Sequence, residues 1–281
     1  FETLRDDMIN PLVANKILSK AQLLIQSRLI TIDFIILFFV ILLSFFLTEQ
    51  TLKPIQKNAS RQKRFIADAA HELRTPIAVV ISGLEVALRN KNLNIEMARI
   101  TLQSSLDVMK EFSLLSNTLL DVSKYDNETQ ADFKNINMKD LLISVTSKMQ
   151  YLATSKNILI QRELTQERNI KGNEIELGRV FVNILNNAIT HTPDGGSIII
   201  TDQNKNNEYV VSIKDTGPGI PKEMLEKIFE PFYRGDASRN TDGAGLGLTL
   251  SRKIIENHKG SIVIDSGIGK GTEVIIKLPF V

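Results

Sequence analysis

One histidine, flanked by charged residues, offers the first possible chemistry. The run Phe65–Pro76 reads FIADAAHELRTP and places His71 beside Glu72, with Thr75 one helical turn further on. Residues four apart share a face of a helix, so His71 and Thr75 are expected to be neighbours. An imidazole beside a carboxylate is a plausible nucleophile, because the carboxylate accepts one ring proton while the other nitrogen attacks. Pro76 is expected to kink or loosen this turn. A solvated helix with an incidental histidine explains the same residues, and chemistry alone leaves both interpretations open.

Three asparagines lie close together on a predicted helix over residues 174–189. Asn183 and Asn187 are four residues apart, so their amides are expected to point the same way. Amide oxygens at this spacing suit Mg²⁺, which prefers oxygen ligands and retains waters and phosphates. Asparagine is a mediocre helix former, which makes the cluster unusual. The alternative is a polar helix face that binds nothing.

Two glycine clusters follow. Asp215–Ile220 reads DTGPGI after a predicted strand, and Gly217 and Gly219 leave the backbone free to approach a ligand. Asp215 can accept a hydrogen bond from an exocyclic amine such as that of adenine, although an ordinary Gly-Pro turn is the alternative. The second cluster, Gly243–Leu248, reads GAGLGL before a predicted helix. Successive glycine amides at a helix N-terminus form an anion site that suits phosphates.

The second glycine cluster is neither of the two common nucleotide motifs. Its spacing is G-x-G-x-G rather than G-x-G-x-x-G, and the chain contains no G-x-x-x-x-G-K-[ST]. Between the clusters lies FEPFYR, at 229–234, followed by a polar run over 235–242. This pattern predicts a mobile flap anchored by two aromatic residues, with Arg234 and Arg239 available to balance phosphate charge.

The elements that must position these residues fall into two classes. Residues 55–127 have helical periodicity with a break at 90–94, which predicts two antiparallel helices that pair with a second copy as a four-helix bundle. From residue 133 an α+β pattern follows, with a turn predicted at 202–208. Strands are predicted at 158–164, 197–201, 209–214, 261–264 and 273–278, and helices at 138–154, 174–189, 221–229 and 247–257.

An apolar stretch near the N-terminus predicts a membrane span. Leu29–Leu47 contains one charged residue, Asp33, and approaches the roughly 20 residues that a bilayer requires. A buried core helix or a signal peptide fits this stretch less well. Five basic residues against one acidic residue follow over 49–64, which favours a cytoplasmic location for everything downstream. Because the first residue is Phe1, we expect the start to be processed or truncated.

Composition excludes several classes of protein. Among 281 residues, 34 are Lys or Arg and 32 are Asp or Glu, which argues against direct nucleic-acid binding through a broad basic face. The sequence has no cysteine, which excludes disulfide frameworks, thiolate metal sites and a thiol nucleophile.

Taken in order, these motifs resemble those of the bacterial sensor histidine kinases of two-component systems. HELRTP resembles their phosphoacceptor box, NILNNA their Asn box, DTGPGI and GAGLGL their glycine boxes, and FEPFYR their Phe box. The resemblance covers about residues 60–281. It implies a homodimer that is embedded in the inner (plasma) membrane, where it contacts membrane lipid, and whose kinase part is cytoplasmic. Such a kinase uses ATP and Mg²⁺ to phosphorylate a histidine, passes the phosphoryl group to an Asp of a response regulator, and also dephosphorylates that regulator.

The resemblance also implies roles for individual residues. His71 would be phosphorylated, Glu72 would be its general base, and Thr75 would position water in the phosphatase reaction. Asn187 would bind Mg²⁺ with support from Asn183. Asp215 would read adenine with Thr272 nearby, and the glycines would shape a lid over the nucleotide. The full set of implied nucleotide contacts is Asn183, Asn187, His191, Asp215, Gly217, Gly219, Arg234, Arg239, Gly243, Gly245, Leu246, Gly247 and Thr272.

One position departs from the family pattern. Thr190, followed by His191, stands where the family usually has Lys or Arg, so a phosphate-contacting cation is missing there. Arg234 or Arg239 is expected to compensate for it.

The resemblance divides the chain into five parts. They are an outer juxtamembrane segment at 1–28, a transmembrane helix at 29–48, a cytoplasmic linker at 49–60, a dimerisation and phosphoacceptor hairpin at 61–128, and a Bergerat-type ATP-binding α/β sandwich at 133–281. The alternatives are a phosphatase-biased or non-catalytic relative, another ATPase of the same superfamily, and a membrane scaffold. The membrane span and HELRTP oppose the second alternative, and the glycine boxes oppose the third.

Overall fold

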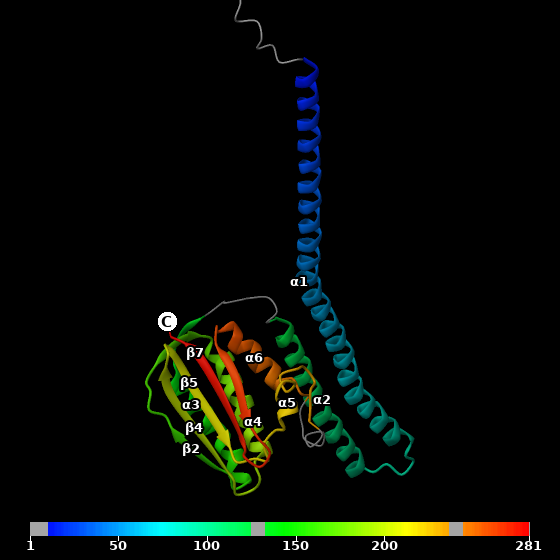
Figure 1. Ribbon diagram of the computed structural model, residues 1–281. Coiled ribbons are helices and arrows are strands. Elements are labelled where there is room, and N and C mark those ends of the chain that lie inside the picture. Colours follow the sequence, from blue (N-terminus) through cyan, green and yellow to red (C-terminus); the bar gives the residue numbers. More distant parts are fainter. Residues whose placement is uncertain (1–10, 125–132, 236–243, 281) are drawn as a thin grey trace, which may run out of the picture. The chain divides into compact units, whose positions relative to one another are not determined.

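The computed structural model describes residues 11–124, 133–235 and 244–280. The chain separates into two units, residues 1–64 and residues 65–281, and each is described by itself. Two helices come first along the chain: α1 (Pro11–Arg89) and, after a short turn, α2 (Ile95–Lys124) (Figure 1). The predicted linker at 49–60 is part of α1 rather than a separate element.

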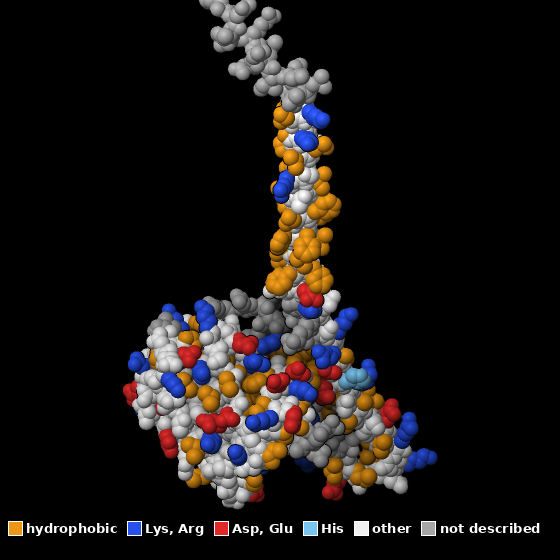
Figure 2. Space-filling view, in the orientation of Figure 1, with side chains coloured by type: hydrophobic (Ala, Val, Ile, Leu, Met, Phe, Trp, Pro, Cys, Tyr) orange, Lys and Arg blue, Asp and Glu red, His pale blue; other side chains and the backbone are white. Residues whose placement is uncertain are grey.

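The first unit contains the apolar part of α1. The stretch Asn15–Lys53 is long and apolar enough to cross a membrane, and the side chains of its most apolar part are not buried against protein. Hydrophobic side chains predominate on the face of this stretch that Figure 2 shows. An exposed helix that is apolar on all faces is typical of a membrane span, because water would not solvate it.

In the second unit, α1 continues without a break through Pro76 to Arg89. The predicted loosening therefore does not end the helix, although Pro76 has no N–H to donate to the Glu72 carbonyl. The side chain of Asn94 accepts the N–H of Met97 at 2.8 Å and begins α2. Both helices expose large apolar side chains, including Leu88, Ile100 and Leu114. Exposed apolar residues along two successive helices indicate a surface that other helices cover.

The remaining elements form a two-layer α/β domain. A five-stranded sheet has the order β2-β4-β5-β7-β6, in which β2 is parallel to β4 and all other neighbours are antiparallel. Helices α3, α4 and α6 cover one face of the sheet (Figure 1). The elements are β1 (Lys134–Asn137), α3 (Met138–Ser155), β2 (Leu159–Glu163), β3 (Asn169–Gly172), α4 (Glu174–His191), β4 (Ser197–Lys205), β5 (Glu208–Asp215), α5 (Lys222–Leu225), α6 (Gly247–Asn257), β6 (Ser261–Ser266) and β7 (Thr272–Pro279).

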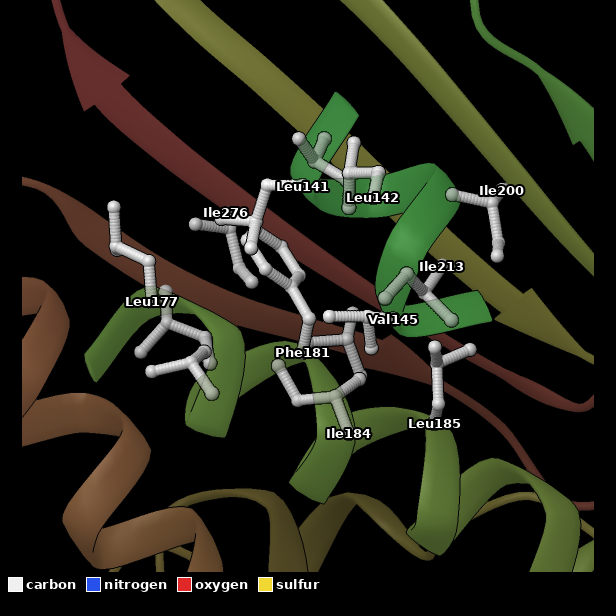
Figure 3. Close-up of a cluster of buried hydrophobic side chains, with 14 of the residues drawn as sticks. Leu141, Leu142, Val145, Leu177, Phe181, Ile184, Leu185, Ile200, Ile213 and Ile276 are labelled. Atoms are coloured by element: carbon white, nitrogen blue, oxygen red, sulfur yellow. The ribbon is translucent and has the colours of Figure 1, made fainter. Parts of the chain in front are cut away.

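The core lies between the helices and the sheet. Phe181 and Leu185 of α4 are fully buried and face Ile200 of β4 and Ile213 of β5, which point toward them from the sheet (Figure 3). Full burial of one such side chain stabilises the fold by about 1.5–3 kcal/mol. Helices α3 and α4 each begin with an asparagine cap, because the side chains of Asn137 and Asn173 accept hydrogen bonds from backbone N–H groups of the first turns. These contacts fix the position of α4, on which several of the predicted site residues lie.

Two predictions about local structure need correction, and two strands were not predicted. The helix predicted at 221–229 ends at Leu225, and the residues after it form turns in which Lys227 and Glu230 donate to carbonyls three residues back. The turn predicted at 202–208 is only Asn206–Asn207, both with positive φ, as a tight type I′ hairpin requires. The short strands β1 and β3, which pair as a separate antiparallel ribbon, were not predicted.

Candidate active site

His71 lies exposed on α1, together with Glu72 and Thr75. The hydroxyl of Thr75 donates to the backbone carbonyl of His71 at 3.2 Å, so the two residues share a helix face as predicted. A shallow hollow of about 510 Å³ lies beside the imidazole and is lined by His71, Arg74, Thr75, Ala78, Val79 and Ser82. The imidazole is therefore accessible to an incoming reactant.

Asp215 lies buried at the end of β5, where its carboxylate organises the first glycine cluster. Its Oδ1 accepts the N–H of Gly217 at 2.8 Å and the N–H of Thr272 at 3.1 Å. Burial raises the pKa of this carboxyl, and the two backbone N–H groups partly offset that effect. In the described part of the chain, no group donates to Oδ2, which is thereby left as an acceptor for a ligand.

The backbone around Asp215 approaches itself too closely for side chains. Gly219 has a φ of +76°, and a Cβ there would lie 1.9 Å from the Gly267 carbonyl oxygen. A Cβ on Gly271 would lie 2.0 Å from the carbonyl oxygen of Asp215. The loop after β5 and the turn between β6 and β7 are therefore packed main chain against main chain.

Asn183 connects α4 to the start of α6. Its Nδ2 donates to the hydroxyl of Ser251 at 2.9 Å, and a Cβ on Gly247 would lie 2.1 Å from its Oδ1. Leu246 is buried and precedes the first turn of α6. The Asn183 amide is thus engaged in packing, whereas the half-buried Asn187 has no hydrogen-bond partner among the residues that the structure describes.

His191 is the last residue of α4, close to the first glycine cluster. A Cβ on Gly217 would lie 3.1 Å from the His191 carbonyl oxygen. Desolvation lowers the pKa of His191; the Asp215 carboxylate acts against this and the Lys156 ammonium adds to it. Lys156 also donates to the carbonyls of Ile189 at 3.2 Å and Thr190 at 3.0 Å, so this cation lies at the C-terminus of α4, where Thr190 supplies none.

The Phe box is held against the second glycine cluster. The N–H of Phe232 donates to the Gly245 carbonyl at 3.1 Å, and the Thr249 hydroxyl donates to the Phe229 carbonyl at 3.1 Å. The ring of Phe232 also lies 5.7 Å from that of Phe65. Arg234 follows this anchor, while Arg239 and Gly243 lie outside the described residues, as does most of the predicted flap.

Helix α4 brings the two glycine clusters into one site. Asn183, Asn187 and His191 recur every four residues and therefore lie along one helix face. At one end of this row Asn183 lies against Gly247, and at the other end His191 lies against Gly217. The two ends are about 12 Å apart along the helix axis, at about 1.5 Å per residue. Asn187 lies midway between the phosphate-type glycine cluster and the Asp215 group.

The described side chains around Asn187 offer Mg²⁺ few protein ligands. Among the residues that the structure describes, no cluster of three His, Cys, Asp or Glu side chains forms a metal cage. The unpartnered amide oxygen of Asn187 nevertheless fits a Mg²⁺ ion that takes most of its ligands from water and phosphate. The residues present therefore suit Mg²⁺ that arrives with a nucleotide.

Sequence reasoning missed three residues that position this site. Ser251 receives the Asn183 amide, Lys156 binds the end of α4, and the Ser266 hydroxyl accepts the N–H of Ile220 at 2.8 Å. Each contact joins residues at least 30 positions apart, so no local spacing indicates it.

Comparison with known proteins identifies both parts of the chain. Residues 61–128 match the His Kinase A (phospho-acceptor) domain, and residues 172–281 match the histidine kinase-, DNA gyrase B- and HSP90-like ATPase family. The phospho-acceptor match separates this chain from the other ATPases of the superfamily.

Curated relatives and solved structures agree with this assignment. The chain is 34% identical to sensor histidine kinase RppB of Synechocystis over 81% of its length and 51% of the relative's. It is 34% identical to sensor protein kinase PmrB of Pseudomonas aeruginosa, over 81% of this chain and 48% of that one. The fold is similar to that of histidine kinase ThkA in a crystal structure with the response regulator protein TrrA (TM-score 0.65, 24% identity, covering 83% of this chain and 65% of that one). The chain spans about half the length of the curated relatives it matches. With both domains present in order, the chain belongs to the sensor histidine kinases.

Proposed function

We propose that this chain uses ATP to phosphorylate His71 and passes the phosphoryl group to an aspartate of a response regulator. The observation that carries the proposal is the row of Asn183, Asn187 and His191 on α4, which joins two glycine clusters at about a nucleotide's length. The exposed His71 supplies the acceptor that such a site requires.

The nucleotide is oriented by groups at both ends of the row. Asp215 Oδ2 accepts the exocyclic amine of adenine, with Thr272 beside it, and the amides of Gly245 and Gly247 face the phosphates. Asn187 is the protein's ligand to Mg²⁺, which neutralises phosphate charge when bound. The Thr190 position lacks the usual cation, and Arg234 and Arg239 are the candidates to replace it.

Phosphoryl transfer depends more on how the enzyme positions the two reactants than on covalent catalysis by the protein. One ring nitrogen of His71 attacks the γ-phosphorus, and the bond from that phosphorus to the bridging oxygen breaks. ADP leaves with the bonding electron pair, while Glu72 accepts the proton of the other ring nitrogen. In the separate phosphatase reaction, Thr75 on the same helix face positions the water that hydrolyses the phosphoryl group of the regulator.

The exposed apolar surfaces of the helices indicate what the protein contacts, namely a second copy of the chain and a membrane. The apolar side chains of α2 and of the second part of α1 are covered by the same residues of a second copy, as a four-helix bundle. The apolar stretch of α1 crosses the inner membrane, and the basic residues after it keep the kinase part in the cytoplasm. The solved complex of ThkA with TrrA supports a response regulator as partner.

Labelling tests the proposal directly. The full chain in detergent is incubated with γ-labelled ATP and Mg²⁺, and the expected product is an acid-labile, base-stable phosphoprotein. His71→Gln is expected to abolish the label while it retains ATP binding, whereas Asn187→Ala abolishes both. Label that persists in His71→Gln, or no label in the wild type, contradicts the proposal. A wild type that dephosphorylates a regulator without labelling itself identifies the phosphatase-biased alternative.

A further inference from the structure

The hydroxyl of Ser266, the last residue of β6, joins the segments around the Asp215 carboxylate. It accepts the N–H of Ile220 at 2.8 Å and donates to the Gly271 carbonyl at 2.7 Å. It also lies 3.1 Å from the hydroxyl of Thr272. Because the Thr272 N–H donates to Asp215 Oδ1, Ser266 is one residue removed from the carboxylate that faces the ligand.

The single proton of the Ser266 hydroxyl determines which group donates in the hydrogen bond between Ser266 and Thr272. A serine hydroxyl has one proton to donate and two lone pairs that accept. The proton goes to the Gly271 carbonyl, which cannot donate, and one lone pair takes the Ile220 N–H, which cannot accept. Only a lone pair of Ser266 remains for Thr272, so the Thr272 hydroxyl must donate its proton to Ser266.

The consequence for the ligand is a change in what Thr272 offers. With its proton held by Ser266, the Thr272 oxygen presents only lone pairs. The backbone N–H of Thr272 bonds Oδ1 of the Asp215 carboxylate, so Oδ2, which is also an acceptor, belongs to the same group of residues. Two neighbouring acceptors match an amino group, which has two N–H donors, and repel a carbonyl oxygen. A 6-aminopurine satisfies this arrangement, whereas a 6-oxopurine leaves three acceptors facing one another.

We propose that Ser266 is a positioning residue for base specificity: by holding the Thr272 proton, it makes the site accept 6-aminopurine nucleotides and reject 6-oxopurine nucleotides. The inference rests on the proposed ATP site. Ser266→Ala releases the Thr272 hydroxyl, which can then rotate and donate to a 6-oxo group. We expect the ATP affinity to fall roughly fivefold and the preference for ATP over ITP to fall roughly tenfold.

The test measures two affinities in the full chain in detergent with Mg²⁺. ATP and ITP displace a bound fluorescent trinitrophenyl-ATP, and the ratio of their affinities is the readout. Ser261→Ala, at the exposed start of the same strand, is the matched control and should leave the ratio unchanged. In a Thr272→Val background, Ser266→Ala should no longer change the ratio, because its effect passes through the Thr272 proton.

Each outcome decides a different question. Equal weakening of ATP and ITP by Ser266→Ala, or an unchanged ratio, overturns the inference and leaves the nucleotide site intact. Failure of the wild type to bind either nucleotide overturns the proposed function instead. If Ser266→Ala does not fold, Thr272→Val still tests the premise: an unchanged preference for ATP in that variant overturns the inference, because the Thr272 oxygen would then not contact the base.

Discussion

Alanine at Gly219 is expected to destabilise the protein far more than alanine at Gly195. Both glycines have left-handed backbone conformations, with φ of +76° and +81°. A Cβ added at Gly195 meets no atom within 4 Å, whereas one at Gly219 would lie 1.9 Å from the Gly267 carbonyl oxygen. The pair of variants therefore separates backbone strain, which both share, from close packing, which only Gly219 has.

The two effects can be assigned magnitudes. A left-handed conformation costs an L-residue about 1–2 kcal/mol, and the loss of unfolded-state entropy returns about 0.4–1 kcal/mol. Gly195→Ala should thus destabilise by roughly 0.5–1 kcal/mol. Gly219→Ala adds overpacking of about 1–3 kcal/mol, near the upper limit because main chain lies on both sides. The expected total is roughly 2–4 kcal/mol.

Urea unfolding of the full chain in detergent measures this difference. The sequence has no tryptophan, but Tyr209 is fully buried, so tyrosine fluorescence reports on the α/β domain. The free-energy change is the shift in midpoint multiplied by the m-value. ATP affinity is measured in parallel and should fall only for Gly219→Ala. Equal destabilisation by the two variants would refute the close-packing argument.

Three further predictions concern buried polar groups. Ser251→Ala leaves the Asn183 Nδ2 without its partner, so we expect a loss of about 1–3 kcal/mol in thermal unfolding and weaker ATP binding; no loss contradicts the role of this contact. Burial lowers the pKa of His258, so its folded form resists protonation, and its contribution to stability is complete above pH 6.5 and lost as the pH falls below that value. Unfolding of wild type and His258→Gln across pH 5–8 checks this, and the variant should show the flatter profile. Burial also raises the pKa of Asp215, so ATP affinity should fall on acidification with a midpoint above 3.8, and a pH series with Asp215→Asn should remove that step.

The long elements could be predicted because their periodicity reflects burial on one face. Strand β5 and helix α4 alternate apolar and polar residues at periods of two and of about 3.6, and both were predicted within two residues. Strands β1 and β3 have four residues each and are mostly polar, so their pairing depends on their neighbours in space rather than on pattern. Strand β4 extends into the segment predicted as a turn, to Lys205, because the Asp202 carboxylate is buried, where it accepts a hydrogen bond from the Tyr209 hydroxyl at 2.8 Å.

The candidate site could likewise be predicted only in part. The shared helix face of His71 and Thr75 and the place of Asp215 at the end of a strand could be predicted from residue type and spacing. The amide of Asn183 could not, because its partner Ser251 lies 68 residues away and only tertiary packing brings the two together. Ser266 was missed because its hydroxyl joins the distant Ile220, 46 residues away, to the neighbouring residues Gly271 and Thr272, and no local pattern indicates that junction.

The main-chain packing around Gly219 and Gly271 bears on drug resistance. Where carbonyls and amides rather than side chains form the wall of a pocket, a point mutation cannot remove the group that an inhibitor contacts. A substitution at either of these two positions adds a Cβ into space already occupied by carbonyl oxygens, and should therefore disturb the proposed ATP site as well as the binding of the inhibitor. A competitive compound that bonds to this backbone should therefore select fewer viable escape variants than one that bonds to the exposed side chains at the rim.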